Sequence, residues 1–319
     1  MNWVNSLNSY GKQRIPYAFF IDFLGESAEL FALNTLHQHQ IFMSFPNFQN
    51  LNFASNNSDI QIHPKYPDLE TYKKSFDKIQ YHLNQGDSYL CNLTFSTPIE
   101  LNLSLDEIFP IVKAKYKILF QQDWLCFSPE TFVKIKDNRI STFPMKGTID
   151  ANLPNAAETL LNSKKEKAEH YTIVDLLRND LSQVAKNVKV DRLMYLEEIR
   201  TQKGKILQMS SEISGNLEEN WQDNLGDILK KLLPAGSISG APKNKTLEII
   251  KEAENHTRNF YTGIAGVFDG ENLDTCVLIR FIEKSDEKYI YKSGGGITAM
   301  SKLEDEYNEI KQKIYVPVF

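Results

Sequence analysis

The spacing of apolar and polar positions predicts strands and helices that follow one another without regular alternation. Residues 15–53 carry short apolar runs separated by turn-forming residues, which is typical of an antiparallel sheet. Residues 54–68 are polar, include two prolines and predict a surface loop. From Leu69 to Gln85 the apolar side chains recur at helical spacing, and Gly86 follows as a residue suited to end a helix.

The remaining chain predicts further elements in an irregular order. Helices are predicted at residues 104–119, 154–185, 221–233, 242–254 and 302–314. Strands are predicted at residues 88–97, 188–199, 205–215, 261–269, 273–283 and 288–293, with a pair of strands within 124–146. Because strands and helices do not alternate as in a βαβ series, this order favours the α+β fold class with mostly antiparallel β-sheets. No repeat, low-complexity tract or linker divides the chain, so we expect a single domain.

Composition and charge narrow the classes of function. The 319 residues are 41% hydrophobic and 24% charged, as in ordinary globular proteins, and the net charge of −5 offers no basic stripe for nucleic acid. No window approaches the roughly 18 apolar residues that a membrane span requires, so we expect no membrane partner. Three cysteines (Cys91, Cys126 and Cys276) lie far apart in apolar contexts, which predicts reduced thiols and a cytoplasmic location.

A predicted β-hairpin brings an acid and an amine to one end of two strands. Its turn is Asp137-Asn138, and both residues tolerate positive φ. Counting outward from this turn places Glu130 opposite Met145, directly beside Lys146. A carboxyl group and an amine at this point are a plausible general acid and nucleophile. A cross-strand salt bridge explains the same spacing, and the pattern of residues leaves both interpretations open.

Two pairs of glutamates are candidate metal ligands. Glu166 and Glu169 are three residues apart on one predicted helix, and Glu306 and Glu309 repeat the arrangement on another. Four carboxylates that converge from two helices suit a hard divalent ion such as Mg²⁺. Each pair on its own is more often part of a solvated helix face, so the metal site depends on convergence of the two pairs in space.

Two glycine-rich segments and one arginine are candidates for binding anions. Residues 236–250 combine a flexible loop with a helix start that carries Lys243 and Lys245, and free N–H groups at such a start attract anions. Residues 292–300 contain three consecutive glycines, which let the backbone approach a ligand or form a bulge. Arg280 lies within the apolar run CVLIRFIE, where it requires either a buried anion or an outward-facing position.

These segments together resemble the chorismate-utilising enzymes, the family of anthranilate, aminodeoxychorismate, isochorismate and salicylate synthases. The resemblance covers roughly residues 70–316. Its motifs are SPE (128–130), PMKGT (144–148), EKAEHYTIVDLLRND (166–180), GSISGAPK (236–243), YTGIAGVFDG (261–270), IR (279–280), GGGI (294–297) and EYNEIKQK (306–313). The resemblance implies a single α+β domain of two stacked antiparallel sheets flanked by helices, with a deep cleft. Residues 1–68 would form a short strand-rich region of this domain, and residues 69–319 the chorismate-binding catalytic core.

The resemblance also implies roles for individual residues. Glu166, Glu169, Glu306 and Glu309 would hold Mg²⁺, directly or through water, and the ion would bridge the ring carboxylate of chorismate. Arg280 and Tyr261 would hold the enolpyruvyl carboxylate, the backbone amides of Gly294, Gly295 and Gly296 would lie near the ring carboxylate, and Lys313 would add positive charge. Glu130 would protonate the departing C4 hydroxyl group.

Two positions distinguish the reactions within this family. Members that add water use a lysine base where this chain has Leu90, which disfavours isochorismate and salicylate synthesis. Anthranilate synthases usually have alanine where this chain has Lys146, whereas aminodeoxychorismate synthases have a lysine that attacks C2 of chorismate. PMKGT therefore predicts synthesis of 4-amino-4-deoxychorismate, the precursor of p-aminobenzoate and folate. The alternatives are anthranilate synthase component I and a catalytically silent paralogue.

Two further expectations concern the partner and the nucleophile. No cysteine-histidine-glutamate amidotransferase domain is recognised in the chain, so the resemblance implies ammonia from solution or from a separate glutamine amidotransferase subunit. An amine that attacks at neutral pH must be partly deprotonated, so we expect burial or nearby cations to lower the pKa of Lys146.

Overall fold

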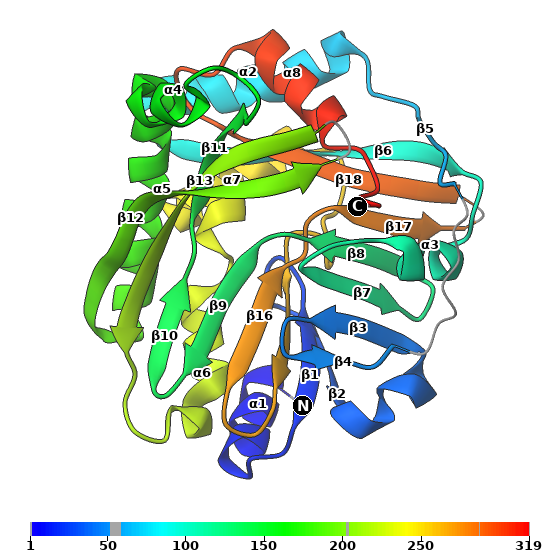
Figure 1. The fold of residues 1–319 in the computed structure, drawn as a ribbon, viewed down its shortest axis with the longest axis vertical. Coiled ribbons are helices and arrows are strands. Elements are labelled where there is room, and N and C mark those ends of the chain that lie inside the picture. Colours follow the sequence, from blue (N-terminus) through cyan, green and yellow to red (C-terminus); the bar gives the residue numbers. More distant parts are fainter. Residues whose placement is uncertain (1, 52–58, 202–203, 287, 319) are drawn as a thin grey trace.

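Two antiparallel sheets form the frame of the protein (Figure 1). The computed structural model describes residues 2–51, 59–201, 204–286 and 288–318. The first sheet has the order β11-β13-β10-β9-β16-β15-β1-β2, with β12 on β13, and the second has the order β14-β6-β18-β17-β8-β7-β3-β4, with β5 on β6. All these pairings are antiparallel, which confirms the α+β class.

The strands divide between the sheets as follows. The first sheet contains β1 (Tyr17–Ile21), β2 (Ala28–Ala32), β9 (Thr131–Lys136), β10 (Arg139–Thr142), β11 (Met145–Asp150), β12 (Lys186–Thr201), β13 (Gly204–Asn216), β15 (Ile264–Phe268) and β16 (Leu273–Val277). The second contains β3 (Ile41–Phe45), β4 (Phe48–Gln49), β5 (Ile62–Pro64), β6 (Leu90–Leu101), β7 (Tyr116–Phe120), β8 (Trp124–Ser128), β14 (Gly240–Ala241), β17 (Phe281–Ser285) and β18 (Lys288–Ile297).

Helices cover the sheets and close their ends. The α-helices are α1 (Trp3–Lys12), α2 (Leu69–Gln85), α3 (Leu105–Ile111), α4 (Ala156–Asn162), α5 (Lys164–Ser182), α6 (Leu225–Leu232), α7 (Lys243–Ala253) and α8 (Leu303–Gln312). Short 3₁₀ helices are η1 (Leu33–His39), η2 (Trp221–Asn224) and η3 (Gly236–Ile238). Figure 1 shows α2, α4 and α8 together at one end of the molecule. No helix of the described segments is long and apolar enough to cross a membrane.

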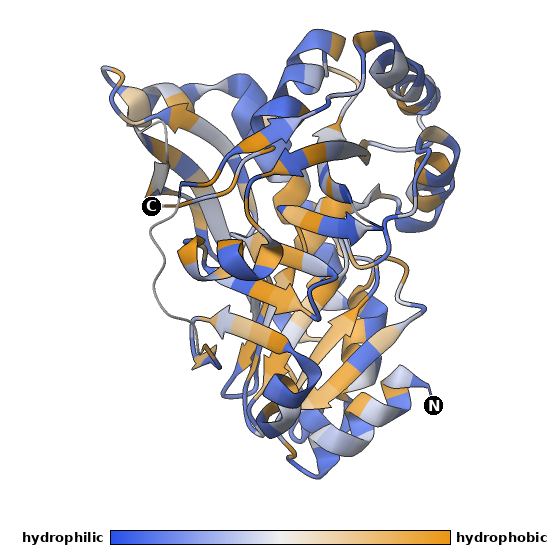
Figure 2. Ribbon diagram, turned by 90° about the vertical axis from the view of Figure 1, so that its right-hand side faces the viewer, coloured by the Kyte–Doolittle hydropathy of each residue, from blue (hydrophilic) through white to orange (hydrophobic). Residues whose placement is uncertain are grey.

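The core lies between the two sheets and under the helices. Figure 2 shows apolar strands inside and mixed or polar helices outside. All five residues of β1 are buried, because this strand is paired on both sides and covered on both faces. The largest apolar cluster joins Phe19 of the first sheet, Leu177 of α5 and Ile297 of the second sheet. Burial of these shared side chains stabilises the sheets and helices as one unit.

Local signals predicted α2 correctly. Asp68 precedes the helix and accepts a hydrogen bond from the backbone N–H of Thr71 at 2.6 Å, while Gly86 ends the helix with φ of +79°. The apolar face that includes Tyr72 and Ile79 is buried. In the predicted loop 54–68, residues 54–58 lie outside the described residues, and the remainder includes the short strand β5.

Two predicted helices have different boundaries. The helix expected at 104–119 is wrong beyond α3, because residues 116–120 form β7, whose five side chains are all buried between β3 and β8. The helix expected at 154–185 is two helices, α4 and α5. They meet at Ser163, whose hydroxyl group accepts a hydrogen bond from the N–H of Glu166 and so starts α5.

Two predicted strands differ from the structure in where they end or pair, and both differences affect the position of site residues. The expected strand 273–283 is wrong, because β16 belongs to the first sheet and β17 to the second, so the chain crosses between sheets at residues 278–280. The hairpin turn is confirmed, with Lys136 opposite Arg139. The predicted pairing of Glu130 with Met145 is wrong, because β11 leaves β9 and pairs with β13 instead.

Candidate active site

A cavity of about 200 Å³ opens between the two sheets and collects most of the predicted site residues. Its wall includes Glu130, Lys146, Glu169, Tyr261, Arg280, Gly294, Gly295, Gly296, Glu309 and Lys313. These residues come from β11, α5, β18, α8 and the residue after it, the crossing between sheets, and the loops before β9 and β15. The antiparallel packing therefore brings together motifs that are far apart in the sequence.

Lys146 enters the cavity from an irregular part of β11. Its side chain is 33% exposed, and Nζ forms an ion pair with Glu169 of α5 at 2.9 Å. Burial lowers the pKa of Lys146, but the charges of Glu169, Glu309 and Glu306 outweigh that effect, so the pKa is raised. The expected lowering of the Lys146 pKa is therefore wrong for the protein without bound ligands. The cause is the set of carboxylates around the amine.

Glu130 lines the same cavity, but it is not paired with Met145 across a hairpin as the sequence predicted. It precedes β9, and its backbone oxygen accepts a hydrogen bond from the N–H of Val277 at 3.1 Å. The hydroxyl group of Ser237 donates to Oε1 of Glu130 at 2.5 Å. Burial raises the pKa of Glu130, although Ser237 and the cations of Lys313 and Arg280 oppose the rise. A carboxyl group in this setting holds its proton at higher pH than usual.

The two glutamate pairs approach each other from α5 and α8. Burial is the main cause that raises the pKa of both Glu166 and Glu306, and the second member of each pair raises it further. Oε1 of Glu309 and Oε2 of Glu306 would lie 3.3 and 3.5 Å from a Cβ atom added to Gly295, so both reach the glycine segment of β18. Glu169 and Glu309 line the cavity, whereas their helix neighbours Glu166 and Glu306 are not among its lining residues.

Two lysines share this end of the cavity with the carboxylates. Lys313 forms an ion pair with Glu309 at 2.6 Å and donates to the backbone oxygen of Gly294 at 2.7 Å. Lys146 pairs with Glu169 in the same way, so each of the two amines neutralises one carboxylate. Among the described residues, no group of three or more histidine, cysteine, aspartate or glutamate side chains is arranged to hold a metal ion.

Arg280 lies at the crossing between the sheets and has an unsatisfied donor. Its φ of +54° is a strained conformation for a residue other than glycine. The guanidinium group stacks 5.2 Å from the ring of Tyr315, and its Nε is buried without a hydrogen-bond partner. A buried, unpaired donor on a cation that lines a cavity suits an anionic ligand. Arg280 is therefore not within a strand as expected, and of the two alternatives that the sequence pattern left open, the buried Nε favours an anionic partner.

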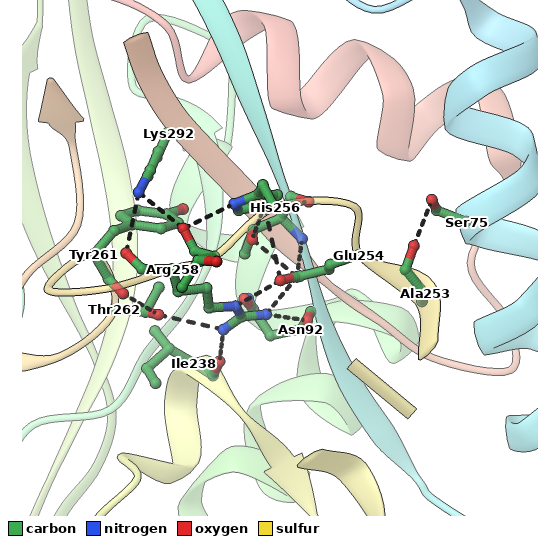
Figure 3. A network of polar contacts seen from close by, with 12 residues as sticks. Ser75, Asn92, Ile238, Ala253, Glu254, His256, Arg258, Tyr261, Thr262 and Lys292 are labelled. Carbon is green, nitrogen blue, oxygen red and sulfur yellow. Dashed lines mark hydrogen bonds and ion pairs between the residues drawn. The ribbon is translucent and has the colours of Figure 1, made fainter. Parts of the chain in front are cut away.

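A buried network fixes the loop that carries Tyr261 (Figure 3). Arg258 donates to Glu254 through Nε and Nη2 at 2.9 and 2.6 Å, and it also donates to the backbone oxygens of Asn92 and Ile238. Glu254 further accepts from the N–H and hydroxyl groups of Thr94. These bonds join the loop to β6 and η3, so Tyr261 is held firmly in the cavity wall.

The other glycine-rich loop does not form the expected anion site. Lys243 forms an ion pair with buried Asp180 at 2.9 Å and donates to the backbone oxygen of Leu232. Lys245 pairs with Glu248 on the surface. The segment instead begins with η3, which contributes Ser237 and Ile238 to the cavity wall.

Sequence reasoning missed two residues that support the candidate catalytic groups. Ser237 binds Glu130, and His170 lies between Lys146 and Ser211, with ring nitrogens 3.2 Å from the Lys146 oxygen and 2.7 Å from the serine hydroxyl. Both lie inside quoted motifs. Their partners are distant in the sequence, so only the fold identifies what they contact.

Comparisons with known proteins identify the family and the fold of this chain. The profile of the family described as chorismate binding enzyme matches residues 29–318. An uncharacterised PabA-like protein of Pasteurella multocida (strain Pm70) is 51% identical over 99% of this chain and 98% of its own length. Aminodeoxychorismate synthase component 1 of Escherichia coli (strain K12) is 32% identical over 93% of this chain and 67% of its own. Anthranilate synthase component I from Streptococcus pneumoniae TIGR4 has the same fold, with a TM-score of 0.73 at 22% identity, covering 96% of this chain and 84% of that one.

Proposed function

Because this chain belongs to the family of chorismate-binding enzymes, we propose that it acts as component I of an aminodeoxychorismate synthase. The observation that carries the proposal is the position of Lys146, whose amine lies in the cavity wall within reach of the glutamates of α5 and α8. A solvated surface lysine would not occupy this place. Glu130 and Arg280 line the same cavity, so a nucleophile, an acid and an anion-binding cation surround one space.

The proposed reaction consists of two allylic displacements on the ring of chorismate. In the first, the neutral amine of Lys146 forms an N–C bond at C2, the ring double bonds shift, and the C4–O bond breaks. Glu130 gives its proton to the departing hydroxyl group, which leaves as water, and the attacking nitrogen becomes a secondary ammonium. Glu130 is suited to this step because burial raises its pKa.

In the second displacement ammonia replaces the lysine. Ammonia forms an N–C bond at C4, the double bonds shift back, and the C2–N bond breaks to return Lys146 as a neutral amine. The product carries the new nitrogen as an ammonium group, and Glu130 regains a proton from water. Ammonia would come from a glutamine amidotransferase subunit, and the product would serve synthesis of p-aminobenzoate and folate in the cytoplasm.

A Mg²⁺ ion is part of the proposal because of the type of side chains present, since the described carboxylates are not themselves arranged around a metal in this structure. Glu166, Glu169, Glu306 and Glu309 would supply the hard oxygen ligands that Mg²⁺ prefers. Burial, and after it the like charge of the second member of each pair, raises the pKa of Glu166 and Glu306. When bound, the ion would neutralise these charges, attract a substrate carboxylate, and weaken the hold of Glu169 on Lys146. Without the opposing charges of the glutamates, burial would lower the pKa of the Lys146 amine.

Product identity tests the proposed function. The protein is incubated with chorismate, Mg²⁺ and ammonium, and a pyruvate-releasing aminodeoxychorismate lyase is then added. We expect p-aminobenzoate, which forms only after the lyase is added. Anthranilate without p-aminobenzoate would favour anthranilate synthase component I, and no turnover at all would favour a silent paralogue.

A further inference from the structure

The backbone of Lys146 lies in an interruption of the ladder between β11 and β13. Met145 pairs with Ser210 and Thr148 pairs with Gln208, so Lys146 and Gly147 together face the single residue between those partners. One extra residue in a strand is a β-bulge, and bulges near active sites redirect a side chain. Gly147 adopts φ of +92°, which a residue with a Cβ atom rarely accepts. The ladder alone therefore does not fix the peptide that carries the lysine.

His170 of α5 supplies a contact that the ladder lacks. Its Nδ1 lies 3.2 Å from the backbone oxygen of Lys146, and its Nε2 lies 2.7 Å from the hydroxyl oxygen of Ser211. A carbonyl oxygen only accepts, so Nδ1 must carry the hydrogen. Both His170 and Ser211 are completely buried. The hydroxyl oxygen of Ser211 already accepts from the N–H of Met194 and keeps its own hydrogen to donate, so Nε2 is the acceptor in this bond.

Ser211 completes the chain of hydrogen bonds from β13. Its hydroxyl group donates to Nε2 of His170 and accepts from the N–H of Met194 at 2.9 Å. Its backbone N–H donates to the oxygen of Pro144 at 2.9 Å. Ser211 thus holds the segment before the lysine directly, and it holds the lysine itself through His170. The peptide of Lys146 is fixed on both sides of the bulge.

We infer that His170 is a positioning residue that aims Lys146 by holding its backbone oxygen, an inference that rests on the proposed role of Lys146 as nucleophile. The neighbouring residue on α5, Glu169, pairs with Nζ of the same lysine. One turn of helix therefore contacts both the backbone and the amine of Lys146. A shift of α5 would move both contacts together, so the lysine follows the helix that carries Glu166 and Glu169.

Two substitutions separate the two bonds of His170. In His170→Asn, the amide nitrogen is two bonds from Cβ, as Nδ1 is, so it can still donate to the Lys146 oxygen. In His170→Gln, the amide group is three bonds from Cβ, as Nε2 is, so it can satisfy Ser211 but not Lys146. We expect kcat to fall about 100-fold in His170→Gln with little change in KM for chorismate, because small misplacement of a reacting group has an effect of this order. His170→Asn should retain most of kcat.

The ring tautomer tests the geometry independently of activity. Nitrogen-15 NMR of the unmodified protein should show His170 as the neutral Nδ1–H form, and Ser211→Ala should weaken that preference. An Nε2–H tautomer in the unmodified protein would overturn the inference, as would equal losses of kcat in His170→Asn and His170→Gln. Thermal unfolding of both variants checks that they are folded. If the unmodified protein makes no aminodeoxychorismate, the proposed function fails, whereas the tautomer measurement still decides the hydrogen bonding of His170.

Discussion

Two charged regions border the same cavity and differ in how their charges are satisfied. In the loop of residues 254–262, Arg258 and Glu254 are nearly inaccessible, and each binds several protein groups. In the cavity wall, Arg280 has a buried donor without a partner, and Glu169 and Glu309 each lie beside a second glutamate on the same helix. The first region is complete without a ligand, so it fixes geometry. The second has an unsatisfied donor and closely spaced like charges, so it is the region where we propose that substrate and metal bind.

The largest effect is expected from Lys146→Ala. Removal of the amine should abolish formation of aminodeoxychorismate from ammonium, because Lys146 is the proposed nucleophile and Lys313 at the same end of the cavity is bound to Glu309 and to the backbone of Gly294. Chorismate binding, measured by calorimetry, should remain. Lys134→Ala, at an ion pair with Asp274 in the first sheet, is a matched control that should keep turnover. Undiminished turnover in Lys146→Ala would remove the covalent role.

Removal of divalent ions should also stop turnover. Treatment with a chelator leaves four glutamates that repel each other and a lysine held by Glu169, so the rate should fall to background and return with added Mg²⁺. Glu309→Gln should weaken Mg²⁺ binding in calorimetry, whereas Glu248→Gln on the surface should not. Full activity in the presence of chelator would contradict the metal site.

Glu130→Gln should lower kcat about 10²- to 10⁴-fold, which is the usual contribution of a general acid. The acid acts only when protonated, and burial raises its pKa, so kcat/KM of the unmodified protein should fall as pH rises through that raised pKa. The pH profile of the glutamine variant should lack this decline. A profile that keeps the same alkaline decline would assign it to another group.

In the loop of residues 254–262, Arg258→Met should lower the free energy of unfolding. Loss of the guanidinium group leaves the carboxylate of Glu254 buried, and breaking such a pair costs about 3–5 kcal/mol of unfolding free energy. Denaturant titration measures this loss, and Glu254→Gln in the same chain should restore part of it. Unchanged stability together with lost activity would place Arg258 in the reaction instead.

Arg280→Met should show the opposite behaviour. Since Nε has no partner in the protein, unfolding free energy should change little. Loss of a charged hydrogen bond to the substrate should raise KM for chorismate about 10- to 100-fold, equivalent to roughly 1.5–3 kcal/mol. If Arg280→Met destabilised the fold as strongly as Arg258→Met, the distinction between the two regions would fail.

Local chemistry made part of this structure predictable from the sequence. The Asp137-Asn138 turn fixes the pairing of the two strands that it joins. In any helix, residues three apart lie on the same face, so the two glutamates of each pair on α5 and α8 were predictably neighbours. The pairing of β11 with β13, in place of the predicted pairing with β9, was not predictable from the sequence because β13 is distant along the chain. For the same reason the pattern of residues did not show the crossing at Arg280 or the link from His170 to Lys146.

The central claim is that Lys146 becomes covalently attached to the substrate. The most direct measurement is intact-mass spectrometry of the protein mixed with chorismate and Mg²⁺ in the absence of ammonia, followed by peptide mapping. We predict an added mass equal to chorismate less one water, located on Lys146, that disappears when ammonium is supplied. Aminodeoxychorismate formation at full rate with no such adduct on Lys146 would contradict the account.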